Sequence, residues 1–295
     1  MRAAAILGPG SSPQVIKRFR SRSGVTWSTG IPANATEADI ILIFGGDGTI
    51  HRYLPQLVAL QLPVLIVPCG SGNDFARALK LRSVRDAQRA WNNFGDDECV
   101  RAIDIGVIKE LDHKSSPNAA QLRHYFCCVA CVGLDATVAR RANALPRWIR
   151  AHGGYALSLP FALWSFKSFA AKFTALYEGA APKDLSSEKM VLAAFANAPA
   201  YGHGVKIAPR AELGDGQLDV CVVSDIGKIR LLSVFPSVYF GRHLSLPQVN
   251  YSTIENLRME TERPMDVYAD GEYVCRTPIE VSVVKESLRV VVSRL

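Results

Sequence analysis

The chain has 295 residues, of which 48% are hydrophobic and 21% charged, a composition typical of a globular protein that excludes a disordered or fibrous one. A chain of this length is comfortable for two domains. The formal net charge of +7 favours an anionic partner, meaning a nucleotide, a nucleic acid or an acidic membrane surface, and charge alone does not choose among them.

The seven cysteines show no disulfide or zinc framework, because the C-x-x-C pair at 128 and 131 has no second pair to complete it. We expect reduced, buried thiols, which suit a cytoplasmic protein. No apolar run is long enough for a signal peptide or a membrane span.

Strand and helix patterns alternate over the first 125 residues. Strands are expected at residues 2–7, 39–44 and 64–67, and helices at 14–20, 49–60, 74–79 and 83–91. Alternation with continuously apolar strands indicates a parallel sheet covered on both faces. We therefore predict an α/β nucleotide-binding domain over residues 1–125, and residues 286–295 are expected to pack back onto it.

Short β-rich runs with turn residues between them dominate the rest of the chain. Strands are expected at residues 100–108, 125–132, 190–196, 218–223, 257–260, 265–268, 279–284 and 287–292. A helical region over 146–173 interrupts them. This pattern predicts a mainly β sandwich over residues 126–285.

Two glycine-rich loops follow neighbouring buried strands of the first domain. Gly-Gly-Asp-Gly-Thr occupies residues 45–49, and Pro-Cys-Gly-Ser-Gly-Asn-Asp occupies 68–74. Glycine lets backbone N–H groups approach an anion without a Cβ in the way, and adjacent parallel strands place their loops at one sheet edge, where α/β folds bind ligands. The alternative is a tight turn in which Asp47 caps a helix. Neither loop fits a dinucleotide-binding or P-loop motif.

Two acidic turns lie far away in the second domain. One contains Asp215 and Gly216, and the other contains Asp270, Gly271 and Glu272. By turn chemistry alone, both are Asp-Gly hairpin tips.

Taken in this order, the motifs resemble the diacylglycerol kinase catalytic domain, which bacterial soluble lipid kinases share with sphingosine and ceramide kinases. The resemblance also includes GLDATVA at 133–139 and APRAELGDGQLDV at 208–220. It implies an NAD kinase-like and phosphofructokinase-like first domain, a β-sandwich second domain, and transfer of the γ-phosphate of ATP to a lipid hydroxyl in the cleft between them. The acceptor would be of the diacylglycerol or sphingoid-base type.

The resemblance also implies roles for individual residues. Those that cradle the ATP phosphates would be Gly45, Gly46, Asp47, Gly48, Thr49, Gly70, Ser71, Gly72 and Asn73. Asp47, Asp74 and Glu272 would hold a catalytic Mg²⁺, and Asp270 would be the general base. A second, structural Mg²⁺ would be bound by the side chain of Asp215 and the backbone carbonyls of Glu212 and Gln217.

The chain departs from the family pattern at three places. The first loop is Gly-Pro-Gly-Ser-Ser at 8–12 instead of Asn-Pro-x-Ser-Gly, Arg52 replaces a family glutamate, and Gly214 precedes a single aspartate in the acidic turn. These departures keep two alternatives open: an NAD kinase-like small-molecule kinase, and a catalytically weak lipid- or nucleotide-binding regulator. Nucleic-acid binding would rest on charge alone, and we do not expect it.

A basic stretch precedes an apolar one between the two sets of motifs. It contains Arg140, Arg141, Arg147 and Arg150, with Trp148 within it and Trp164 further along. Tryptophan at a headgroup boundary and arginine beside anionic lipid would allow peripheral contact with the inner face of the membrane, where a lipid substrate lies. The alternative is a solvated basic helix packed on the sandwich. A homodimer is compatible with the resemblance.

Overall fold

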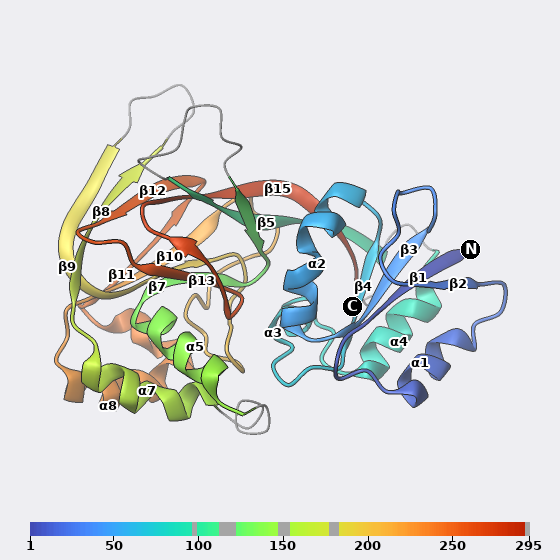
Figure 1. Ribbon diagram of the computed structural model, residues 1–295, viewed down its shortest axis with the longest axis horizontal. Helices are drawn as coiled ribbons and strands as arrows, with labels where there is room; N and C mark the ends of the chain where they lie inside the picture. The colour runs from blue at the N-terminus through green and yellow to red at the C-terminus, as the bar shows by residue number, and fades with distance from the viewer. Residues whose placement is uncertain (96–98, 112–121, 147–153, 177–182, 293–295) are drawn as a thin grey trace. The chain divides into compact units, whose positions relative to one another are not determined.

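The computed structural model describes residues 1–95, 99–111, 122–146, 154–176 and 183–292. It divides into two compact units, Met1–Ile105 with Lys285–Leu295, and Gly106–Val284 (Figure 1). The boundary therefore falls at residue 105 and not at 125. The reason is that β6 (Arg123–Phe126) pairs with residues 106–109 of β5 (Val100–Glu110), which places both segments in the second unit.

The first unit contains a parallel sheet in the strand order β15–β4–β3–β1–β2. Its strands are β1 (Arg2–Leu7), β2 (Thr26–Thr29), β3 (Ile40–Gly45), β4 (Val64–Pro68) and the end of β15 (Ile279–Val291). Every residue of β3 is buried, as expected for a strand covered on both faces. The predicted α/β domain is confirmed, while β2, which is short and mostly exposed, was not predicted.

Four helices connect these strands: α1 (Pro13–Arg20), α2 (Asp47–Leu60), α3 (Asp74–Ala78) and α4 (Val84–Asn93). Ser83 caps the start of α4. Ser83 Oγ accepts a hydrogen bond from the Asp86 N–H (3.2 Å) and donates to Asp86 Oδ2 (2.8 Å). The completely buried Trp91 of the same helix donates from Nε1 to the Phe19 carbonyl at 3.0 Å.

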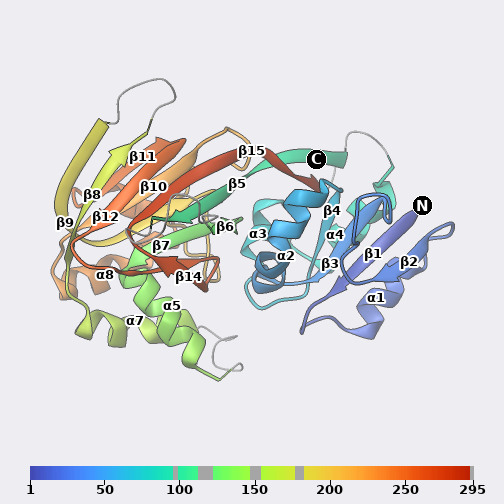
Figure 2. The same ribbon diagram turned by 45° about the horizontal axis from the view of Figure 1, so that its top comes forward.

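The second unit is mainly antiparallel sheet (Figure 2). Besides β5, β6 and the start of β15, its strands are β7 (Val129–Gly133), β8 (Phe169–Ala175), β9 (Lys183–Ala196), β10 (Leu218–Ser224), β11 (Val249–Ile254), β12 (Asn256–Thr261), β13 (Asp266–Ala269) and β14 (Glu272–Arg276). They run in the order β14–β13–β7–β9–β8–β12–β15, with β10 pairing with β9 and β11. The long strand β9 pairs with β8 through its first half and with β7 and β10 through its second.

In the described part of this unit, the helices are α5 (Leu134–Ala144), α7 (Gly154–Ser165), α8 (Lys228–Val238) and the 3-10 helix η2 (Arg242–Ser245). Among the described residues, the structure offers no helix whose length and apolar character would let it cross a membrane.

Three predictions about the second unit were wrong in detail. The helix expected over 146–173 ends at Ser165, and β8 follows, because its apolar side chains alternate between buried and more exposed positions with the period of a strand. The strand expected at 125–132 is broken at residues 127–128. The last two predicted strands form the single strand β15, in which Glu286 has a positive φ of 50° and donates its N–H to Asp104 Oδ1 at 2.8 Å.

Candidate functional site

Loops that follow β1, β3 and β4 meet at one edge of the parallel sheet. The Gly8 N–H donates to the Phe44 carbonyl at 2.8 Å, and the Cys69 N–H donates to the Gly45 carbonyl at 3.0 Å. A Cβ on Gly70 would lie 2.5 Å from the Cα of Gly46. The loops therefore touch through backbone, and the predicted convergence of the two glycine loops is observed.

Side chains within the loops hold their shape. Asn73, with a left-handed φ of 57°, accepts a hydrogen bond from the Gly70 N–H at 2.9 Å and donates to the Gly70 carbonyl at 2.6 Å. Thr49 fills the space beside Gly45, since a Cβ on that glycine would lie 2.7 Å from Thr49 Oγ1. Asn73, Thr49 and the Gly70 N–H are thus engaged inside the site, whereas Gly48 and Ser71 are exposed.

Asp47 caps a helix, although not the helix that it begins. Its carboxylate accepts hydrogen bonds from the N–H groups of Asp74 (3.1 Å) and Phe75 (3.2 Å) at the start of α3. Gly46, the residue before α2, makes no side-chain cap. The capping alternative is therefore correct for α3, and this cap joins the two glycine loops.

The carboxylates of Asp47 and Asp74 face the same space in front of Gly72. A Cβ on Gly72 would lie 2.8 Å from Asp47 Oδ2 and 3.6 Å from Asp74 Oδ2. Asp74 is buried, and its Oδ1 pairs with the half-exposed Arg77 at 2.6 Å. Arg77 lies three residues after the second glycine loop, and no role was predicted for it. Because Mg²⁺ prefers carboxylate oxygens and needs room for water, this donor set fits the ion.

Asp270 lies at a hairpin tip in the second unit, as its turn chemistry indicated. Asp270 and Gly271 have positive φ values of 50° and 86° and form the two-residue connection between β13 and β14. Its carboxylate accepts hydrogen bonds from the N–H groups of Cys127 (2.9 Å), Cys128 (2.8 Å) and Val129 (3.2 Å). Three N–H donors suit an ionised carboxylate, and they bind the hairpin to the break between β6 and β7.

The thiol of Cys127 also donates to Asp270 Oδ2 at 3.3 Å. One ligand atom each from Cys127, Cys128 and Asp270 lie within 4.8 Å of one another. Cys131, the partner of Cys128 in the C-x-x-C pair, is not in this group. Glu272 is exposed at the start of β14.

The predicted structural metal turn contains an internal hydrogen bond. The Gln217 N–H donates to Asp215 Oδ1 at 3.0 Å, and Glu212 and Asp215 are both exposed. Sequence reasoning missed Asp219, which is buried on β10. Burial raises the pKa of Asp219, and the nearby carboxylates of Asp215 and Glu212 raise it further. Such an accumulation of negative charge fits a divalent cation. The sequence feature that could have identified Asp219 is an acidic residue within the otherwise apolar run of β10.

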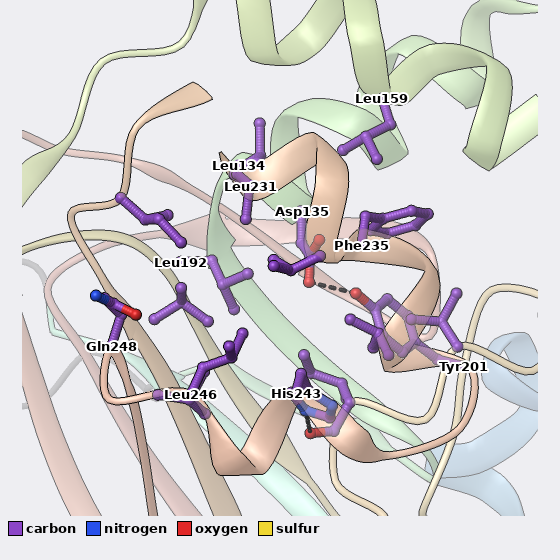
Figure 3. A pocket seen from close by; sticks show the side chains of 17 residues that line it. Leu134, Asp135, Leu159, Leu192, Tyr201, Leu231, Phe235, His243, Leu246 and Gln248 are labelled. Carbon is purple, nitrogen blue, oxygen red and sulfur yellow. Dashed lines mark hydrogen bonds between the residues drawn. The ribbon is translucent and has the colours of Figure 1, made fainter. Parts of the chain in front are cut away.

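An apolar cavity lies in the second unit between α7, α8 and the strands β9 and β10 (Figure 3). Its polar groups include Asp135 and Tyr201, whose hydroxyl donates to the carboxylate, and His243, which donates from Nε2 to the Ile207 carbonyl at 3.0 Å. Burial lowers the pKa of His243 and favours its neutral form. The motif at 133–139 contributes Leu134 and Asp135 to this cavity, but no role was predicted for them. The leucine and valine side chains that line the rest indicate a core equally well.

Comparison with protein families identifies both units. Residues 27–108 match the diacylglycerol kinase catalytic domain, and residues 128–292 match the YegS C-terminal NAD kinase beta sandwich-like domain. The second match covers more than half of the chain.

Curated relatives include two diacylglycerol kinases. The one from Mycobacterium tuberculosis is 29% identical over 258 residues, which are 88% of this chain and 78% of the relative. The one from Bacillus subtilis is 24% identical over 239 residues, 80% of this chain and 72% of the relative.

Solved structures share the fold at low identity. A diacylglycerol kinase from Bacillus anthracis has a TM-score of 0.66 and 16% identity, over 98% of this chain and 96% of the other. An NAD kinase from Archaeoglobus fulgidus in complex with ATP has a TM-score of 0.52 and 13% identity, over 100% and 94%. The fold, the loop motifs in their order and both domain matches agree, and the chain belongs to the diacylglycerol kinase catalytic-domain family of lipid kinases.

Proposed function

We propose that this chain transfers the γ-phosphate of ATP to a hydroxyl group of a diacylglycerol or of a sphingoid base. The observation that carries the proposal is that, in the first unit, two glycine loops meet backbone to backbone and the carboxylates of Asp47 and Asp74 lie together beside Gly72. Phosphoryl transfer needs positioning and charge neutralisation more than covalent chemistry, and this arrangement supplies both.

The first unit would bind the phosphate donor. The exposed Gly48 and Ser71 would offer backbone N–H groups and a hydroxyl to phosphate oxygens. Asp47 and Asp74 would hold Mg²⁺ through their carboxylate oxygens, either directly or through a bridging water. Glu272 of the second unit would be a further ligand. When bound, Mg²⁺ neutralises charge on the β- and γ-phosphates.

The second unit would supply the base. Asp270 would accept the proton of the lipid hydroxyl while the hydroxyl oxygen bonds to the γ-phosphorus and the bond from that phosphorus to the ADP oxygen breaks. Its three N–H donors would fix the direction of the carboxylate.

The apolar cavity favours a lipid acceptor over a soluble one. Its walls consist largely of leucine, valine and isoleucine side chains, to which an acyl or alkyl chain is complementary. A soluble acceptor, as in the NAD kinase-like alternative, has no acyl or alkyl chain to bury against these side chains. Arg52 is exposed on α2, at a position where the family has a carboxylate. Because a cation replaces that carboxylate, the alternative of a catalytically weak regulator stays open to test.

Transfer of labelled γ-phosphate from ATP tests the proposal. The purified chain is given Mg²⁺ and mixed micelles that contain diacylglycerol, sphingosine, ceramide or phosphatidylglycerol, and a separate reaction contains NAD without detergent. We expect a labelled diacylglycerol or sphingoid product that depends on Mg²⁺. Labelled NADP would favour the NAD kinase-like alternative, and ATP binding without any labelled product would favour the regulator.

Magnesium is expected to stabilise the second unit through the turn at Asp215. At about ten times its Kd, a bound ion adds about 1.4 kcal/mol, or roughly 3–6 °C in the unfolding midpoint. Because the folded pKa of Asp219 is raised, its ionisation lowers stability as pH rises above the ordinary value of 3.8, and the Mg²⁺ effect should grow over that range.

Thermal unfolding without nucleotide, with and without Mg²⁺, measures this effect. Asp215→Asn should remove most of the shift, whereas Asp225→Asn, at an exposed aspartate just after β10, should keep it. An equal Mg²⁺ shift in the wild type and in Asp215→Asn would contradict a metal at this turn.

A further inference from the structure

Helix α7 exposes an apolar face. Leu157, Phe161 and Trp164 are spaced four and three residues apart, so they lie along one side of the helix, and Phe161 and Trp164 are 69% and 84% exposed. The opposite side, with Leu159 and Leu163, is buried. A helix at the surface of a globular protein normally turns a polar face to water, and α7 does not.

Helix α8 is apolar on two sides. Leu231, Val234, Phe235 and Val238 line the apolar cavity, as Figure 3 shows for the labelled Leu231 and Phe235. Ile229 and Leu232 point away from it, and Ile229 is 88% exposed. None of the residues of α8 is buried. The helix therefore separates the apolar cavity from an outer surface that is also apolar.

The two exposed faces belong to neighbouring helices. Lys228 Nζ at the start of α8 donates to the Trp164 carbonyl in α7 at 2.6 Å, and the two helices are adjacent in Figure 1. Phe240, 72% exposed, follows α8, and the Arg242 guanidinium lies 5.9 Å from its ring centre. We call the set Leu157, Phe161, Trp164, Ile229, Leu232 and Phe240 the α7–α8 surface.

Positively charged side chains predominate around this surface. The exposed cations on the same segments are Lys167, Lys228, Arg230 and Arg242. The chain has no aspartate or glutamate at 154–168 or at 226–254. Arg141 of α5 joins them, because it bonds to Ser165 at the end of α7 at 3.2 Å. The exposed Asp225 lies near Lys167 and Lys228, so the cations around the surface outnumber an acid at its edge. Exposed apolar side chains with an excess of cations are complementary to an anionic bilayer interface.

We propose that the α7–α8 surface docks the protein on an anionic lipid bilayer. The apolar side chains insert at the boundary between headgroups and acyl chains, and the lysine and arginine side chains contact lipid phosphates. The inference rests on the proposed function, since only a lipid acceptor requires access to a bilayer. Docking places α8 between the bilayer and the apolar cavity. Trp148, Arg147 and Arg150, which the sequence also suggested, lie outside the described residues.

Flotation with vesicles, without nucleotide or lipid acceptor, tests the docking. Vesicles contain phosphatidylcholine alone or mixed with phosphatidylglycerol, and the variants are Ile229→Glu and Trp164→Glu. The matched control is Leu122→Glu, which changes a leucine of the same unit that is 69% exposed and outside the surface. We expect binding to the mixed vesicles, about tenfold weaker partitioning for the two surface variants, and none of this loss for the control.

Tryptophan fluorescence supplies a second readout. Trp164 should move from water to a less polar environment on binding, so emission should shift to shorter wavelength, and Trp164→Phe should remove the shift. High salt should weaken binding, because the lysine and arginine contacts are screened.

Equal partitioning of Ile229→Glu and Leu122→Glu would overturn the proposal. So would a dimer in light scattering that Ile229→Glu dissociates while vesicles bind none of the protein, since the surface would then join two copies of the chain. Phosphate transfer to lipid in mixed micelles separates the two claims: activity there without vesicle binding defeats the docking and leaves the lipid kinase.

Discussion

Replacing Asp270 with asparagine is expected to lower the rate of phosphoryl transfer by about 10²–10⁴-fold. An amide cannot accept the proton of the lipid hydroxyl at neutral pH. Nucleotide binding should persist, because the glycine loops lie in the first unit and Asp270 lies in the second. The measurement is labelled-phosphate transfer at saturating ATP and lipid, together with ATP affinity by calorimetry.

The Asp270→Asn variant also needs a control for stability, because the carboxylate that it removes accepts three backbone hydrogen bonds. In the asparagine variant an NH₂ group replaces one oxygen and must face the N–H of Cys127 or those of Cys128 and Val129, which we expect to cost about 1–3 kcal/mol. Rates are therefore compared at a temperature where both proteins are folded by circular dichroism. An activity loss explained by the unfolded fraction alone would remove Asp270 from the reaction.

Asp266→Asn is the matched control. Asp266 lies on the same strand, four residues earlier, and pairs with the exposed Arg276 at 3.0 Å and with Arg140 at 3.6 Å. Surface pairs of this kind contribute about 0–1 kcal/mol, so the variant should keep its activity and most of its stability. Equal loss in the two variants would indicate that negative charge on β13, and not a base at the hairpin tip, is what matters.

Replacing Gly70 with alanine is expected to weaken ATP binding by about 100-fold. The new Cβ would lie 2.5 Å from the Cα of Gly46 and 3.0 Å from Asn73 Oδ1. Since the nearer contact is with backbone, no rotamer change relieves it, and the two glycine loops must separate. The overpacking should also cost about 1–3 kcal/mol of stability. Calorimetry with ATP and Mg²⁺ and urea unfolding measure the two effects.

Gly227→Ala controls for the general effect of a glycine-to-alanine change. Gly227 precedes α8 with a φ of −54°, and a Cβ there would meet no heavy atom within 4 Å. Its ATP affinity should match that of the wild type. If Gly70→Ala bound ATP as well as Gly227→Ala does, the close approach of the two glycine loops would have no part in holding the nucleotide.

Local patterns in the sequence determined most elements of the first unit, though not β2, and the identity of its site motifs. A continuously apolar strand such as β3 and the capping pair of Ser83 and Asp86 depend on neighbours within a few residues. The loops at 45–49 and 68–74 could be assigned to one site because the carboxyl ends of adjacent parallel strands meet at one edge.

Tertiary structure alone decided how the motif residues are used. Asp47 caps α3, which begins 27 residues later, and Asp270 accepts hydrogen bonds from a strand break more than 140 residues earlier. Asp219 and Asp135 are buried, and no local sequence pattern indicates that these two acids are buried. Likewise, α7 could be read as a core helix until the packing left one of its apolar faces uncovered. A side chain's type is local information, but its exposure and its partners depend on contacts between segments far apart in the chain.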